Sequence, residues 1–131
     1  PRRAGNLRLS GGINRARRGI LMINREVTNM TIVTLDNFEK EVMQAETPVV
    51  VDFWASWCGP CMMLAPVMEA LDPEVPGVKF CKVNVDDERD LAMEFQIDSI
   101  PTLLCVKGGK VVKRLVGYRE KDALKKELEA L

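Results

Sequence analysis

Histidine is absent from this sequence of 131 residues, and so are long apolar runs. Without histidine, a zinc site would need all four cysteines, but Cys81 and Cys105 lie in separate predicted strands, so no metal site is expected. No stretch approaches the roughly eighteen consecutive apolar residues of a membrane-spanning helix, and the arginine-rich start lacks the apolar region of a secretory signal. We therefore expect a cytoplasmic protein that binds neither membrane nor nucleic acid.

The formal net charge of zero conceals an uneven distribution of charge. Residues 1–30 carry seven arginines and one acid, whereas residues 31–131 carry twelve basic and eighteen acidic side chains. Residues 1–29 have no sustained periodicity, and we interpret them as a basic leader, disordered or foreign to the domain, with Met30 as the natural start. An organellar transit peptide is the alternative interpretation. A single domain is expected over residues 30–131.

The remaining sequence alternates short apolar strands with helical patterns. Buried strands are predicted at 49–55 and 78–85, and 102–106 and 111–116 are predicted to pair around a Gly108-Gly109 turn. Asp36 and Glu39 resemble a capping pair that opens a helix to about Gln44. The other predicted elements are a strand at 32–34, a helix after Cys58, a short helix to about Phe95 that begins in the acidic run 86–90, and an amphipathic helix at 120–131.

This order of elements indicates an α/β fold. Right-handed crossovers in the first part give parallel strands covered by helices, and the final hairpin adds antiparallel strands. We therefore expect a mixed central β-sheet flanked by helices on both faces. The acidic run 86–90 is interpreted as a solvated helix start, and Cys81 and Cys105 as small buried apolar residues.

Residues 49–66, VVVDFWASWCGPCMMLAP, place two cysteines between a buried strand and a helix. Cys58 lies beside the helix N-terminus, where unpaired N–H groups favour a thiolate. Two intervening residues bring Cys61 onto the same face, so a disulfide can form and break without rebuilding the fold. Pro60 suits the first helical turn, and Gly59 allows close approach of another chain. A lone CxxC would also fit half a zinc site.

WCGPC after a VDFWA strand resembles the active site of the thioredoxin family, and the resemblance covers Thr31 to Leu131. It implies the thioredoxin fold and protein disulfide reduction by dithiol–disulfide exchange. Cys58 would be the attacking nucleophile and Cys61 the buried resolving thiol. The resemblance further implies a monomer without bound cofactor that acts on disulfide-containing proteins and is recharged by an NADPH-dependent thioredoxin reductase.

Asp52 occupies the middle of the apolar strand, where an unpaired carboxylate is costly. Burial should raise the pKa of this carboxyl group. By resemblance, Asp52 is the acid/base that helps to deprotonate Cys61, and Lys82 in the next strand pairs with it. A purely structural buried ion pair is the alternative for both residues.

Ile100-Pro101, which precedes a predicted strand, is a second feature that resembles the thioredoxin family. The family's matching proline is cis and packs against the active-site disulfide, and its neighbouring backbone binds an extended substrate. The remaining substrate-binding residues of the expected flat, apolar patch are Trp57, Gly59, Pro60 and Gly117. Met62 and Met63 stand where many members of the family carry a basic residue.

Two other functions compete with disulfide reduction. The chain could be a binding or assembly module with incidental redox activity, but binding alone needs neither a resolving thiol nor a buried carboxylate. An oxidant or isomerase of secreted proteins is disfavoured by the missing signal sequence and by Gly59-Pro60, which accompany reducing behaviour in the family that this chain resembles.

Overall fold

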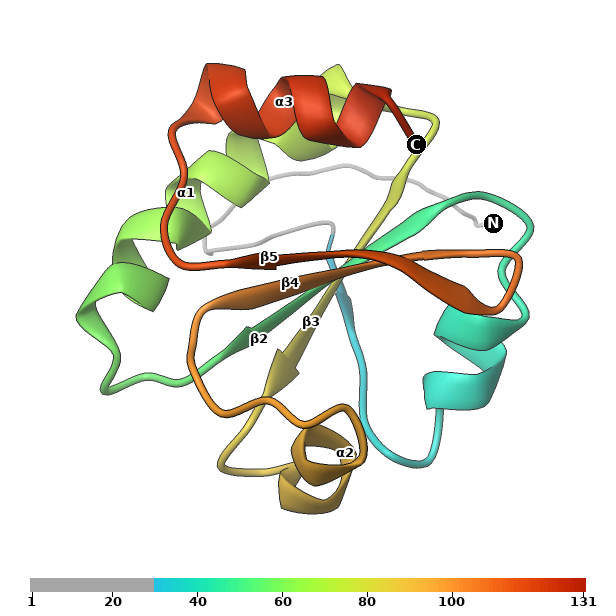
Figure 1. Cartoon of the computed structure of the whole chain (residues 1–131), viewed down its shortest axis with the longest axis vertical. Helices are drawn as coiled ribbons and strands as arrows, with labels where there is room; N and C mark the ends of the chain where they lie inside the picture. Colours follow the sequence, from blue (N-terminus) through green and yellow to red (C-terminus); the bar gives the residue numbers. More distant parts are fainter. Residues whose placement is uncertain (1–29) are drawn as a thin grey trace, which may run out of the picture.

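The computed structural model describes residues 30–131, which build a five-stranded mixed sheet in the order β1-β3-β2-β4-β5 (Figure 1). β1 pairs parallel with β3, and β3 pairs parallel with β2, whereas β4 runs antiparallel to both β2 and β5. The α/β prediction with a mixed sheet is therefore confirmed. The strands are β1 (Thr31–Ile32), β2 (Val49–Trp54), β3 (Lys79–Asn84), β4 (Thr102–Lys107) and β5 (Lys110–Val116).

Helices cover both faces of this sheet (Figure 1). On one face lie α1 (Gly59–Glu74) and α3 (Lys121–Glu129), and on the other lie a single π-helical turn, η2 (Glu39–Met43), and α2 (Arg89–Glu94). Two buried apolar clusters correspond to these faces, one with Leu64 of α1 and Leu124 of α3, the other with Val42 of η2 and Leu91 of α2. None of the helices in residues 30–131 is long and apolar enough to cross a membrane.

Strand β2 is the centre of the sheet and of the core. It has a strand on each side and helices on each face, which explains why its sequence is apolar at nearly every position. Val50 packs in the cluster of α1 and α3, whereas Val49 and Val51 pack in the cluster of η2 and α2. Because side chains alternate along a strand, Asp52 shares the face of Val50, which is the face covered by α1.

The predicted capping pair of Asp36 and Glu39 is wrong. The residue that precedes η2 is Phe38, and no side chain caps the turn. The backbone N–H of Thr34 instead donates to the Asn37 side-chain oxygen at 2.7 Å, which stabilises the preceding turn without a helix cap. The expected helix to Gln44 is therefore reduced to the five residues of η2.

The ends of the other predicted elements shift by only a few residues. The Gly108-Gly109 turn is present, with positive φ at both glycines. The helix expected from the acidic run begins only at Arg89.

Met30 is buried in the cluster of α1 and α3. The prediction of a basic leader concerns residues 1–29, which lie outside the described residues.

Candidate active site

Cys58 and Cys61 form a disulfide at the start of α1, with 5.2 Å between their Cα atoms. Cys58 is the N-cap of the helix, and its extended backbone conformation ends the turn that follows β2. Pro60 lies within the first turn, where its missing N–H costs no hydrogen bond. The predicted position of both cysteines between the strand and the helix is therefore confirmed.

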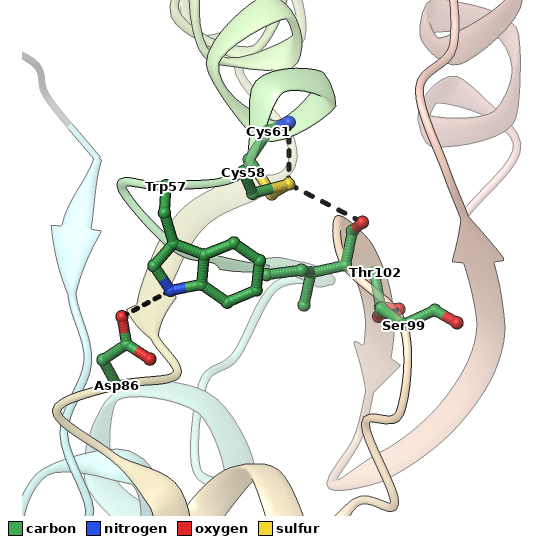
Figure 2. The surroundings of a disulfide bond; sticks show 7 residues. Trp57, Cys58, Cys61, Asp86, Ser99 and Thr102 are labelled. Atoms are coloured by element: carbon green, nitrogen blue, oxygen red, sulfur yellow. Dashed lines mark hydrogen bonds between the residues drawn. A yellow bond between two sulfur atoms is a disulfide. The ribbon is translucent and has the colours of Figure 1, made fainter.

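The two sulfur atoms have different surroundings. The backbone N–H of Cys61 donates to Sγ of Cys58 at 3.2 Å (Figure 2), and the first turn of α1 contains no acidic residue. On reduction, this N–H and the helix N-terminus favour negative charge on the Cys58 sulfur. Both cysteines are buried, but Cys58 is 6% exposed and Cys61 only 1%. Cys58 is thus both the more exposed cysteine and the one whose sulfur is placed to carry charge.

Asp52 is a buried carboxyl group with one unpartnered oxygen. It is 5% exposed, and its Oδ1 atom has no hydrogen-bond partner. Desolvation raises the pKa of Asp52 to about 7, and the positive charge of Lys82 acts in the opposite direction. The predicted rise in pKa is confirmed, and it makes this carboxyl group able to exchange protons near neutral pH.

Lys82 is next to Asp52 in the sheet, since the two residues are register partners in the parallel pair of β2 and β3. Its ammonium group, however, lies 5.0 Å from the centroid of the Trp54 ring. No ion pair within 4.0 Å joins Lys82 to Asp52 in the part of the chain that the structure describes. Lys82 is therefore the strand neighbour of Asp52 and acts on it through its charge, without a direct salt bridge.

A cavity of about 210 Å³ connects the carboxyl group to the disulfide. Asp52 and Cys61 both line it, so the carboxyl group and the buried cysteine border the same space. The burial of both groups keeps bulk water from competing for this transfer. The remaining lining residues are Met30, Trp54, Met62, Ala65, Glu69 and Lys82.

The Ile100-Pro101 peptide bond is cis, as the resemblance implied. The carbonyl oxygen of Ile100 lies 3.7 Å from Sγ of Cys58, so this segment closes one side of the disulfide. The backbone N–H of Gly117 donates to the Pro101 carbonyl at 2.8 Å, with Gly117 at φ 94°, a conformation that favours glycine. The structure therefore brings all three residues to the disulfide end of the sheet.

An exposed surface surrounds the disulfide. The Trp57 side chain is 69% exposed, and Gly59 and Pro60 are exposed beside it. Ile100 and Gly117 are half-buried and complete the predicted patch. A backbone segment or apolar side chain of another protein can therefore reach the disulfide without displacing core residues.

Asp86 is a residue of this surface that the sequence interpretation missed. Its Oδ2 atom accepts a hydrogen bond at 2.8 Å from the indole Nε1–H of Trp57, and in Figure 2 the indole points at this carboxylate. Glu88 has a comparable role, since its Oε1 accepts from the backbone N–H of Leu35 at 2.9 Å. The acidic run is exposed and leads into α2, as interpreted, but it also supplies these two side-chain contacts. The sequence offered one signal for Asp86. It follows closely after β3, and β2, the strand beside β3, ends at Trp54, three residues before Trp57.

The other two cysteines lie away from this chemistry. Cys81 and Cys105 are free and fully buried, as expected for small apolar residues. Burial raises the pKa of each thiol to about 11, so neither is a reactive thiolate at neutral pH. Within residues 30–131, no group of three or more Cys, Asp or Glu side chains could hold a metal ion.

The family model described as Thioredoxin matches residues 29–130. The "Thioredoxin" of Chlorobaculum thiosulfatiphilum is 47% identical over 94 residues, which cover 71% of this chain and 87% of that protein. The "Thioredoxin" of Alicyclobacillus acidocaldarius is 43% identical over 99 residues, covering 75% and 94%. The mouse "Thioredoxin, mitochondrial" is 41% identical over 106 residues, covering 80% of this chain and 64% of that protein.

Proposed function

The chain belongs to the thioredoxin family and is a protein disulfide reductase, and we propose that Cys58 is its attacking nucleophile and Cys61 its resolving thiol. One observation carries this assignment. The Cys58 sulfur caps the N-terminus of α1 and accepts the Cys61 N–H, and Cys58 is the more exposed of the two cysteines. A thiolate in this position is both stabilised and accessible.

The first step is attack by the Cys58 thiolate on one sulfur of the substrate disulfide. The substrate S–S bond breaks as the new S–S bond forms, and the departing sulfur leaves as a thiolate that takes a proton from water. The product is a mixed disulfide between Cys58 and the substrate. Trp57, Gly59 and Pro60 are exposed around the reacting sulfur and would contact the incoming protein.

The second step is attack by Cys61 on Sγ of Cys58, which releases the second substrate sulfur and closes the Cys58–Cys61 disulfide. Cys61 must first lose its proton, and its burial makes direct transfer to bulk water slow. We assign the acceptor role to Asp52, because both residues line one cavity and the pKa of Asp52 is raised to about 7. The substrate gains two electrons in all, and the enzyme dithiol loses them.

Substrate backbone would bind beside the cis Pro101. Ile100 precedes this proline, and its carbonyl oxygen lies next to Sγ of Cys58. An extended substrate segment can add to such a backbone edge, with its cysteine placed against Cys58. Gly117, whose N–H is bonded to the Pro101 carbonyl, would flank the same segment without a side chain in its path.

Recharging requires an external reductant, since each turnover leaves the oxidised pair. We propose that a thioredoxin reductase drawing on NADPH supplies the two electrons, and that the chain works as a monomer. A cytoplasmic location is supported by the two free thiols, which persist in reducing compartments. Relatives described as mitochondrial make the organelle matrix the alternative, and cell fractionation distinguishes the two.

The reduction potential of the Cys58–Cys61 pair tests the assignment as a reductase. Equilibration with glutathione at known ratios, followed by mass analysis of the alkylated dithiol, gives this potential directly. We expect a value nearer the roughly −270 mV of thioredoxin than the roughly −120 mV of a periplasmic oxidant. A value as oxidising as the latter would contradict disulfide reduction as the function.

A further inference from the structure

A hollow of about 160 Å³ lies directly beside the disulfide. It shares two walls with the active site, because Trp57 precedes Cys58 in the chain and the Ile100 carbonyl contacts the Cys58 sulfur. Figure 2 shows the Trp57 indole facing the segment that carries Ser99 and Thr102. The residues that line this hollow, here named the Trp57 hollow, are Trp57, Val85, Ile97, Asp98, Ser99 and Ile100.

The walls of the Trp57 hollow are held by hydrogen bonds. On one side, the Trp57 indole is fixed by its bond to Asp86 at 2.8 Å. On the other, the backbone N–H of Ile97 donates to the Ala92 carbonyl at 2.9 Å, and the Thr102 hydroxyl donates to the Ser99 carbonyl at 2.6 Å. The segment that carries Asp98 is thus tied to α2 at one end and to β4 at the other. A side chain entering the hollow would meet preformed walls.

The size of the hollow fits one side chain. Pockets for small-molecule ligands usually start at about 300 Å³, roughly twice this volume. Apart from Ser99 and Asp98, its lining consists of the apolar side chains of Trp57, Val85, Ile97 and Ile100. A long aliphatic stem would therefore replace water against these walls at a favourable free energy.

Asp98 gives the hollow a negative rim. It is the one charged residue among the six described lining residues, and it is exposed. Within residues 30–131, no hydrogen bond or ion pair engages its carboxylate. Arg114, which contacts the segment just before Asp98, directs its Nη2 to the Phe95 carbonyl at 2.7 Å. The other residues of 31–131 add to the negative field, with seventeen acidic against twelve basic side chains.

We propose that the Trp57 hollow receives a lysine or arginine side chain of the substrate, from a position close to the substrate cysteine. The aliphatic stem lies on Trp57, Val85 and Ile100, and the cationic head reaches the Asp98 carboxylate. This inference rests on the reductase function and adds a substrate class to it, namely proteins whose reducible disulfide is flanked by a basic residue. Such a contact is sequence-selective, whereas the exposed patch around Cys58 accepts any backbone.

The test uses the full chain and short cyclic peptides that contain one disulfide. The peptides differ only at a residue near the cysteine, which is Lys, Gln, Glu or diaminopropionic acid, an amine with a single methylene stem. We expect kcat/KM for the Lys peptide to exceed that for the Gln peptide by up to about fivefold, the upper range of an exposed ion pair. The Glu peptide should be the poorest, and the short amine should gain less than Lys because it cannot cover the apolar walls.

Asp98→Asn should bring the ratio of Lys to Gln peptides close to one, and Asp98→Lys should reverse the order of Lys and Glu peptides. These ratios do not depend on any general change in activity. The matched control is Glu129→Gln, which removes one exposed charge from α3 on the other face of the sheet and should keep the wild-type ratio. In about 1 M salt, where charges are screened beyond about 3 Å, the preference should shrink.

Three results would overturn the proposal. A wild-type ratio that persists in Asp98→Asn would exclude the carboxylate as the selecting group. An equal loss in Glu129→Gln would indicate steering by net charge, and equal gains for the short and long amines would exclude burial of the stem. Failure of the enzyme to reduce even the Gln peptide would instead contradict the reductase function, so the two failures are distinguishable.

Discussion

Lys82 is the register partner of Asp52, yet its ammonium group lies over the Trp54 ring, 5.0 Å from the centroid, and not on the carboxylate. Asp52 therefore keeps an unpartnered Oδ1 in a buried strand. The lysine lowers the pKa of this carboxyl group, but desolvation is the larger effect and sets the value near 7. The arrangement leaves a proton acceptor that a tight ion pair would have removed.

Replacing Asp52 with alanine should stabilise the protein while slowing its chemistry. A desolvated carboxylate burdens the folded state, so the free energy of unfolding should rise by about 1 kcal/mol or more at pH 8. Resolution of the mixed disulfide should become slower, because Cys61 loses its proton acceptor. Denaturant unfolding and timed decay of the mixed disulfide measure the two effects. A destabilised variant with unchanged decay would make Asp52 a structural group only.

The stabilising effect should depend on pH. The pKa of Asp52 is about 7 in the folded state, above the unfolded value of about 3.9. The folded protein therefore binds this proton more tightly, and the contribution of Asp52 to stability is full below about pH 4 and is lost as the pH rises through 7. The advantage of the alanine variant should accordingly grow from pH 4 to pH 8. An advantage that is constant with pH would contradict the raised pKa.

Lys82→Met should move the pH dependence of the second step. The methionine keeps an apolar stem but removes the charge that lowers the pKa of Asp52, so this pKa should rise further. The midpoint of the rate of mixed-disulfide decay should then shift to higher pH. Lys110→Met, at an exposed position at the start of β5, is the control and should leave the midpoint in place. An unshifted midpoint for Lys82→Met would separate Lys82 from the mechanism.

Asp86→Ala should loosen Trp57 next to the disulfide. Loss of one exposed hydrogen bond costs about 0.5–1.5 kcal/mol at most, so the fold should remain stable. We expect a modest fall in kcat/KM, of about twofold to fivefold, and greater mobility of the indole in time-resolved fluorescence. Asp86→Asn retains an acceptor oxygen and should recover much of both. Asp87→Ala serves as the control; a similar change in that variant would indicate a general charge effect.

Much of this architecture follows from the sequence because its elements are set by local patterns. The run of valines at 49–51 needs burial on both faces, and Gly59-Pro60 suits a helix start, so β2, α1 and the cysteine pair could be predicted. The errors have a common cause, which is competition between side chains for polar partners. Asn37 supplied a turn contact where Asp36 was expected to cap a helix.

Two features of the active site also depend on contacts between distant segments. Asp86 bonds to Trp57 across 29 positions of the chain, and no local pattern distinguishes it from its acidic neighbours. The ammonium group of Lys82 could contact either the Asp52 carboxylate or the Trp54 ring, which both lie on β2. Side-chain packing places it over the ring. Sequence spacing gives the strand neighbours of such residues but not the direction of their charged groups.

We propose that residues 1–29 are dispensable for the reaction. A chain that begins at Met30 retains the buried Met30 side chain and every described contact of the site. Its melting temperature and its rate of disulfide reduction should match those of the full chain. A large loss in either measurement would assign a docked, functional role to the basic segment.

The assignment of Cys58 as the attacking nucleophile and Cys61 as the resolving thiol is tested most directly by trapping the mixed disulfide. Cys61→Ser, incubated in reduced form with an oxidised protein substrate and analysed by mass spectrometry, should accumulate a covalent complex through Cys58. Cys58→Ser should accumulate little or none, because Cys61 is only 1% exposed and the two free thiols of Cys81 and Cys105 are fully buried. Equal trapping by both variants, or preferential trapping through Cys61, would contradict Cys58 as the attacking nucleophile.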